Sequence, residues 1–204
     1  MLTGGSFILA SCNDFLDREP LDSVTPDNFF FTENDLAAYA VKHYNFTTHE
    51  GFNAGIWKND NATDNQAATD YDKKWIPGQW KVPEAYDNPA SNDPWYFSTI
   101  REANYFLETV VPRFEKGEIE GSETNIKHYI GEMYFLRAKN YLSKLETFGD
   151  FPIIKNTLPD ESESLIQASK RAPRYKVAHF ILEDLDQAIS LLTNNISGGK
   201  NRIT

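Results

Sequence analysis

A tryptophan-rich stretch of the sequence carries the side chains best suited to hold a sugar. Trp57, Trp75 and Trp80 share this stretch with the polar residues Asn61 and Asp64. The flat faces of indole rings can stack on the C–H faces of sugar rings, while amide and carboxylate groups can hydrogen-bond sugar hydroxyls. These five residues are our candidate ligand contacts. The alternative is that the tryptophans pin a long loop to the core.

The single cysteine, Cys12, is the second position with chemical meaning. It ends the short apolar run Phe7-Ile8-Leu9-Ala10-Ser11, which resembles the lipobox read by the bacterial lipoprotein signal peptidase. Residues 1–11 contain no Lys or Arg, so we expect them to be the remainder of a longer signal peptide. Cys12 would then carry the fatty acyl groups and begin the mature chain. A free buried cysteine is the alternative.

The residues around Cys12 also predict where the protein is located in the cell. No stretch approaches the roughly 20 apolar residues that a membrane-spanning helix needs, so attachment would have to be by the lipid. An acidic stretch after Cys12 resembles the signal that directs some Gram-negative lipoproteins to the cell surface; it contains Asp14, Asp17 and Glu19. We therefore expect an outer-membrane lipoprotein that faces the exterior.

Several function classes are disfavoured by composition and motifs. Thirty acidic against 20 basic residues give a formal charge of −10, which argues against nucleic acid as a partner. One cysteine cannot build a disulfide within the chain or a cysteine-based zinc site. No nucleophile elbow, phosphate loop or metal dyad occurs, so we expect no enzyme and no cofactor. A cluster of oxygen side chains lacks the spacing of a calcium loop and is interpreted as solvated; it comprises Asp60, Asn61, Asp64, Asp70 and Asp72.

Hydrophobic periodicity predicts an all-α fold that could position these residues. Apolar residues recur at helical spacing in four segments, near residues 32–44, 92–112, 123–148 and 174–192. The segment 123–148 is apolar on two sides and should lie between other helices. Residues 45–94 and 150–173 lack this periodicity and are expected to be irregular. Two long helices suggest tetratricopeptide-like pairs, although no clean repeat can be laid on the sequence.

The sequence also predicts where helices begin and end and which charged residues form ion pairs. Thr32 should cap the first helix with Asp35 three residues on, and Gly149 should end the long one. For the second helix we expect Asn92 as the N-cap, Pro94 in the first turn, Trp95 packed at the start, and Pro112 at the end. Cross-helix ion pairs are expected between the long helix and the one before it, each contributing at most about 1 kcal/mol where exposed; their members are Glu132, Arg137, Arg101 and Glu102.

Several segments, in their order and spacing, resemble the N-terminal region of the SusD/RagB family of outer-membrane lipoproteins. They are Cys12-Asn13-Asp14-Phe15-Leu16-Asp17 with Pro20, Ile100-Arg101-Glu102-Ala103-Asn104-Tyr105-Phe106-Leu107-Glu108, Gly131-Glu132-Met133-Tyr134-Phe135-Leu136-Arg137-Ala138, Phe148-Gly149-Asp150-Phe151-Pro152 and Ile181-Leu182-Glu183-Asp184-Leu185-Asp186-Gln187-Ala188.

The resemblance implies a helical protein with tetratricopeptide-like pairs that binds glycans or other nutrients. It also implies a partner, a TonB-dependent outer-membrane transporter of the SusC kind. On this interpretation residues 1–11 are the signal remnant, 12–31 an extended tether, and 32–204 the N-terminal helical domain of a longer family member, truncated here. The alternative function is a helical-repeat lipoprotein that serves as a scaffold for protein partners.

Overall fold

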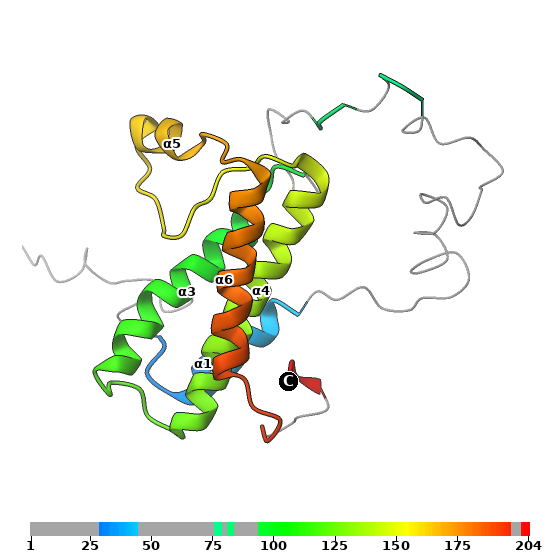
Figure 1. The fold of residues 1–204 in the computed structure, drawn as a ribbon. Helices are drawn as coiled ribbons and strands as arrows, with labels where there is room; N and C mark the ends of the chain where they lie inside the picture. The colour runs from blue at the N-terminus through cyan, green and yellow to red at the C-terminus, as the bar shows by residue number, and fades with distance from the viewer. Residues whose placement is uncertain (1–28, 45–75, 79–80, 84–93, 197–200) are drawn as a thin grey trace, which may run out of the picture.

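The structure is a computed structural model that describes residues 29–44, 76–78, 81–83, 94–196 and 201–204. Within these ranges the chain forms five helices and no sheet: α1 Glu33–Lys42, α3 Ser98–Glu115, α4 Glu123–Phe148, α5 Ser162–Ala168 and α6 Arg174–Leu191 (Figure 1). The prediction of an all-α fold is confirmed. None of these helices is long and apolar enough to cross a bilayer. The tetratricopeptide-like pairing stays a prediction.

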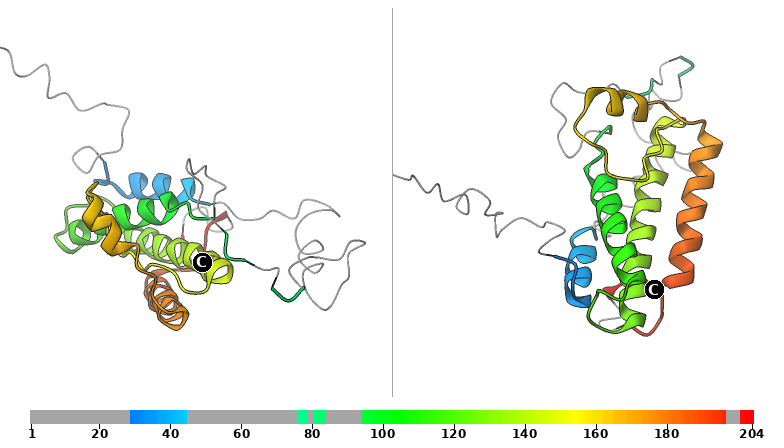
Figure 2. Two further views of the ribbon diagram at one scale, coloured as in Figure 1. Left: turned by 90° about the horizontal axis from the view of Figure 1, so that it is seen from above. Right: turned by 90° about the vertical axis from the view of Figure 1, so that its left-hand side faces the viewer.

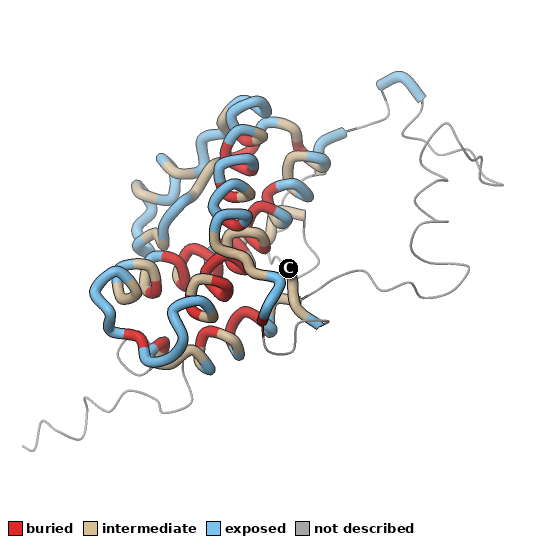
Figure 3. The backbone as a smooth tube through the Cα atoms, turned by 60° about the horizontal axis from the view of Figure 1, so that its bottom comes forward, coloured by how far each residue is buried: buried red, intermediate tan, exposed pale blue. Residues whose placement is uncertain are grey.

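α4 is the central helix of the described bundle. It packs against α1, α3 and α6, and Figure 2 shows these helices side by side in the order α1, α3, α4, α6, with α5 across one end. Buried residues follow the inner sides of the long helices (Figure 3). α6 runs antiparallel to α4 at the edge of the bundle and leaves Tyr175, Leu182 and Ile189 exposed on its outer side.

The ends of α1 and α4 follow from local sequence, as predicted. The Thr32 hydroxyl accepts a hydrogen bond from the Asp35 N–H at 3.3 Å, and the Asp35 carboxylate accepts one from the Thr32 N–H at 3.0 Å. This capping box satisfies two backbone donors that the first turn would otherwise leave free. α4 ends at Gly149, whose φ of 71° lies in the left-handed region that glycine tolerates.

A glycine lets α4 and α6 approach each other closely. A Cβ atom at Gly131 would lie 3.1 Å from the Leu191 Cβ and 3.2 Å from the Ala188 carbonyl oxygen. Such distances are tighter than ordinary van der Waals contact, so a larger residue would push the two helices apart. The absence of a side chain at Gly131 therefore helps to set the distance between α4 and α6.

The predicted start of α3 is wrong. The helix begins at Ser98, and Pro94 lies in a turn before it rather than in its first turn; Asn92 falls outside the described residues. Trp95 and Phe97 both pack into an aromatic cluster against Phe151, so side-chain burial governs the chain path before Ser98.

Pro112 does not end α3, which continues to Glu115. The proline lies in the last turn, where its missing N–H removes only one hydrogen bond of the helix. The chain closes this end through the Lys116 N–H, which donates to the Pro112 carbonyl at 3.2 Å. The segment 150–173 was expected to be irregular throughout, but part of it forms the short helix α5.

Replacing Ala138 with Asp tests the central position of α4. Ala138 is 1% exposed, so the new carboxylate would be buried without a partner, and we expect a loss of at least about 3 kcal/mol in the free energy of unfolding. Leu142→Asp is the matched control on the same helix, because Leu142 is 45% exposed and its replacement should change stability by less than about 1 kcal/mol. Circular dichroism melts measure both. Equal melting temperatures for the two variants would contradict the packing described.

Candidate functional site

The residues predicted for lipid attachment and ligand contact all lie outside the described part of the chain. They are Cys12, Trp57, Asn61, Asp64, Trp75 and Trp80, and the acidic residues Asp60, Asp70 and Asp72 lie outside it as well. Their roles stay predictions. The structure does describe the residues that flank the tryptophan-rich segment, Tyr44 and Pro94, and a cavity beside Trp95.

The segment leaves the bundle at Tyr44, which a buried carboxylate holds. The Tyr44 hydroxyl donates to Glu132 Oε1 at 2.6 Å and accepts from the Ile203 N–H at 3.1 Å. Arg202 binds the same carboxylate through two hydrogen bonds, Nε to Oε1 at 2.9 Å and Nη2 to Oε2 at 2.8 Å. The segment's starting point is therefore fixed to α4 and to the last described residues.

The Glu132 carboxylate is ionised despite its burial. Burial by itself raises its pKa, but hydrogen bonds from His128, Arg202 and Tyr44 outweigh that effect and hold the pKa of Glu132 below its ordinary value. The His128 ring takes part as a donor. The Thr193 N–H donates to its Nδ1, which leaves the proton on Nε2, 3.1 Å from Glu132.

The segment returns to the bundle at Pro94 and Trp95. Trp95 Nε1 donates to the Pro83 carbonyl at 2.7 Å, and its ring lies 4.1 Å from the Phe148 ring, between centroids. Lys144 donates to the Pro94 carbonyl. As predicted, Trp95 packs against neighbouring side chains. The helix itself begins three residues later, at Ser98. Lys144 follows Glu132 by about 18 Å along α4, so the two attachment points lie well apart.

A buried guanidinium group joins three helices near the return point. Arg137 of α4 binds Asp184 of α6 through Nε to Oδ2 at 2.8 Å and Nη2 to Oδ1 at 2.7 Å. Its Nη1 donates to Asn104 Oδ1 of α3 at 2.9 Å and to the Lys155 carbonyl at 3.3 Å. The Arg137 and Asp184 side chains are only 7% and 4% exposed. Burial raises the pKa of the Asp184 carboxyl more than Arg137 lowers it.

The same network fixes the segment between α4 and α5. The Asn104 amide donates to the Ile154 carbonyl at 2.8 Å and to the Asn156 carbonyl at 3.3 Å. Tyr141 adds a reciprocal pair, because its hydroxyl accepts from the Ile154 N–H at 2.8 Å and donates to the Ile154 carbonyl at 3.1 Å. A loop with this many hydrogen bonds to buried side chains forms a fixed wall.

That wall borders an apolar cavity of about 340 Å³ between the start of α3, the loop after α4, and α5. Its apolar lining comes from all three parts and comprises Trp95, Phe97, Ile100, Pro152, Ile154, Leu158 and Leu165. Polar groups on the lining are few: Arg101, Asn104, Asn156 and Ser169. A cavity of this size and character can hold a small molecule with an apolar body.

The predicted ion pairs between α3 and α4 are wrong in their partners. Arg137 pairs with Asp184 of α6, and Glu132 with Arg202, and both pairs are buried. Glu102 pairs instead with Lys42 of α1 at 3.3 Å. Helical spacing identifies which residues lie on a face, but it cannot say which distant helix faces them. The one available signal was position, because Glu132 and Arg137 lie among the buried apolar residues of α4.

The described part of the chain has no metal-binding cluster, and its two buried carboxylates are paired. In this part of the chain, no group of three or more His, Cys, Asp or Glu is placed to hold a metal ion. The buried carboxylates of Glu132 and Asp184 each form a salt bridge with an arginine. The geometry supplies an apolar cavity with one wall fixed by hydrogen bonds, and fixed residues at Tyr44 and Trp95.

Comparison with known proteins places this scaffold in a family. Residues 14–204 match a SusD-like family model described as starch-binding and associating with the outer membrane. The chain belongs to the SusD-like family. Two curated relatives from Formosa agariphila, SusD-like proteins P2 and P38, are 25% and 27% identical over 88% and 91% of this chain.

The SusD-like fold is also seen in a solved structure. The crystal structure of a SusD-like protein from Bacteroides fragilis matches 90% of this chain with a TM-score of 0.55 and 23% identity, which shows a shared fold. This chain spans 35% of the length of each curated relative and 34% of that solved chain. The match therefore concerns about one third of those SusD-like proteins.

The sequence segments that resemble the SusD-like family supply the buried networks. Asn104, Arg137 and Asp184 come from three different segments and meet in one hydrogen-bonded group. Gly131 and Glu132 begin the middle segment, where they set the α6 approach and anchor Tyr44. Residues that carry the resemblance therefore also hold the described helices together.

Breaking the Arg137–Asp184 pair should destabilise the bundle strongly. Arg137→Met would leave the Asp184 carboxylate buried and unpaired, and we expect a loss of about 3–5 kcal/mol in the free energy of unfolding. The double variant Arg137→Met/Asp184→Leu should recover much of that loss, because neither charge remains. Denaturant unfolding of the single and double variants measures the coupling.

An exposed pair between α6 and the loop after α4 supplies the control. Lys155 and Glu183 are 57% and 64% exposed, with 3.3 Å between Nζ and Oε2. Lys155→Met should cost less than about 1 kcal/mol because water screens the pair. Similar losses for Arg137→Met and Lys155→Met would show that the buried network does not hold the bundle as described.

Proposed function

We propose that the chain is part of a surface lipoprotein that captures a glycan or other nutrient and delivers it to a SusC-like TonB-dependent transporter. The observation that carries this proposal is the family match across residues 14–204, with its description as starch-binding and associating with the outer membrane. The role is binding rather than catalysis. Starch-type glucans are the first ligands to test, because that description names them.

The tryptophan-rich segment is the proposed contact surface for the glycan. Trp75 and Trp80 are the leading candidates and Trp57 is next, with Asn61 and Asp64 as partners for sugar hydroxyls. The described scaffold supports this role because it holds both ends of the segment, at Tyr44 and Trp95. Fixing both ends reduces the conformational freedom that a binding segment loses when ligand binds.

The anchor is proposed to be a lipid on Cys12. A single acyl chain gives only marginal membrane affinity, so the mature protein would need the two or three chains that bacterial lipoproteins carry. An outward-facing position would put the tryptophan segment in reach of external glycans and of a transporter in the same membrane.

A scaffold for protein partners is the second candidate function. It is favoured by the outer side of α6, where Tyr175, Leu182 and Ile189 are 61%, 56% and 74% exposed at seven-residue spacing. Seven residues bring a helix back to nearly the same face, so these side chains form one apolar stripe. A chain that binds no saccharide but binds protein partners through this stripe would favour the scaffold over nutrient capture.

The variants Trp75→Ala and Trp80→Ala test the glycan site. We expect maltooligosaccharide affinity measured by calorimetry to fall by about tenfold or more for each, because each lost stacking surface should cost roughly 1.4 kcal/mol. Melting temperatures should stay near the parent value. Trp95→Ala is the contrasting variant, since its ring packs against Phe148 and its loss should lower stability.

The opposite pattern would identify the rings as loop anchors. Melting temperatures that fall for Trp75→Ala and Trp80→Ala as far as for Trp95→Ala, with saccharide affinity unchanged, would remove them from the site. Binding that survives in all variants would place the glycan contacts elsewhere in the protein.

Mass spectrometry of the membrane fraction tests the anchor. Cys12 should be the first residue of the mature chain and carry two or three acyl groups, and Cys12→Ala should leave the chain unprocessed. Ser11→Thr is a milder control that keeps the cysteine in place. An unmodified Cys12 in the membrane fraction, or retention of Met1, would overturn the lipoprotein assignment.

A further inference from the structure

We propose that the cavity beside α5 is a second ligand site, separate from the tryptophan segment, that takes a small aryl carboxylate: an aromatic body carrying one carboxylate group. The proposal rests on three features of the cavity: its aromatic wall, its cationic rim and its fixed loop wall.

The aromatic wall ends in two rings that border the cavity. Phe97 lies 5.1 Å from Phe151 with an interplanar angle of 11°, and Trp95 lies 5.7 Å from Phe151 with an angle of 24°. Phe148 stacks on the same ring at 5.2 Å. Trp95 and Phe97 line the cavity, so an aromatic ring bound there would join an existing stack.

The apolar character of the cavity disfavours a sugar. The lining groups Ile100, Ile154, Leu158 and Leu165 cannot hydrogen-bond hydroxyls. Asn104 is not available either, because its amide and carbonyl groups are already bonded to the Ile154 and Asn156 carbonyls and to Arg137. Burying a hydroxyl without a partner costs free energy, so a ligand with few polar groups fits better.

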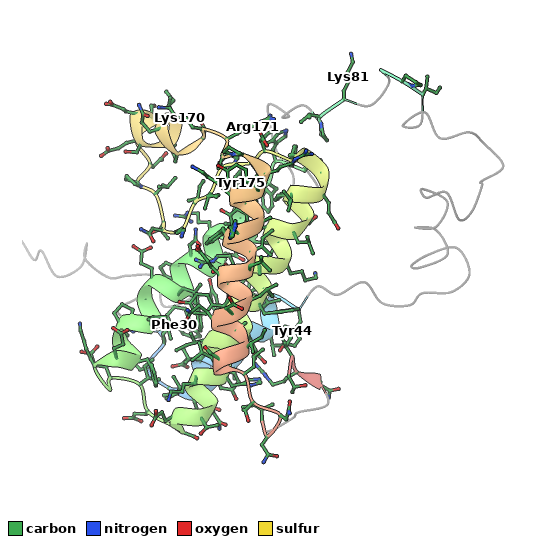
Figure 4. All side chains as sticks on the ribbon, viewed as in Figure 1. Phe30, Tyr44, Lys81, Lys170, Arg171 and Tyr175 are labelled. Atoms are coloured by element: carbon green, nitrogen blue, oxygen red, sulfur yellow. The ribbon has the colours of Figure 1, made fainter. Side chains whose placement is uncertain are left out.

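The rim of the cavity is cationic in an acidic chain. The chain as a whole carries a charge of −10, yet among the described residues no Asp or Glu lines this cavity, and Arg101 does. Arg101 forms no ion pair with any residue in the described ranges and is exposed. The Arg171 guanidinium lies 4.9 Å from the ring centroid of Trp95, a lining residue, and adds a second positive charge there. Figure 4 shows Arg171 between α5 and the start of α6. A carboxylate at this rim would gain charge-assisted hydrogen bonds.

The loop wall is held in place before any ligand binds. The loop wall is fixed at Ile154 by Tyr141, and one residue before Leu158 by Glu108, whose carboxylate accepts from the Thr157 N–H at 2.9 Å and hydroxyl at 2.8 Å. α5 has no buried residue, so substitutions on it can change the cavity without disturbing the core.

Calorimetry with 4-phenylbutyrate and its neutral counterpart 4-phenylbutanol tests the proposal on the full chain. We expect saturable one-to-one binding of 4-phenylbutyrate and binding of the alcohol that is about fivefold weaker, the factor that corresponds to about 1 kcal/mol for an ion pair at an exposed rim. Arg101→Gln should reduce the affinity for the carboxylate to that for the alcohol and leave the alcohol unchanged. Arg174→Gln is the control, because Arg174 is exposed and lines a different hollow.

A matched pair on α5 tests the location. Leu165 is 42% exposed and lines the cavity, whereas its neighbour Ile166 is 64% exposed and does not. Leu165→Asp should weaken 4-phenylbutyrate binding by about tenfold or more through loss of apolar contact and charge repulsion. Ile166→Asp, the same change one residue on, should leave it unaltered.

Three results would overturn the proposal: no saturable binding of 4-phenylbutyrate, equal affinity of the parent chain for the acid and the alcohol, or equal weakening by Leu165→Asp and Ile166→Asp. The outcome is independent of saccharide capture. Trp75→Ala and Trp80→Ala should leave 4-phenylbutyrate binding unchanged, and Leu165→Asp should leave maltooligosaccharide binding unchanged.

Discussion

The burial of the Arg137 guanidinium is the constraint on which the described fold depends. An unpaired charge in the interior would cost several kcal/mol, so each of its donors must meet an acceptor. Asp184 of α6, Asn104 of α3 and the Lys155 carbonyl supply those acceptors. One side chain of α4 thereby fixes the placement of two other helices and of the loop that follows α4. The cavity wall is a consequence, because the loop that Asn104 holds is the one that borders the cavity.

A second buried charge applies the same rule five residues earlier in α4. Glu132 lies fully inside and is neutralised by Arg202, with Tyr44 and His128 completing its hydrogen bonds. Its partners come from the end of α1 and from the last described residues, so segments distant in sequence are joined at one carboxylate. Tyr44, the last described residue before the tryptophan segment, is therefore held by a buried network of α4.

The sites proposed on this scaffold differ in the chemistry they can recognise. The tryptophan segment combines ring faces with Asn61 and Asp64, which suits a hydroxyl-rich sugar. The cavity beside α5 combines ring faces with aliphatic groups and Arg101, which suits an apolar body with a negative charge. Aromatic residues are common to both, so the polar partners determine which ligand each site would prefer.

The sequence by itself determined the helical class and the extents of α1, α4 and α6, because helical periodicity and end signals such as Thr32 and Gly149 act within a few residues. It could not determine the start of α3 before Ser98, because the preceding aromatic side chains pack against a ring more than fifty residues away. Nor could it pair Arg137 with Asp184. Local spacing shows which face of a helix a residue occupies, and only the tertiary structure decides which helix meets that face and what cavity is left between them.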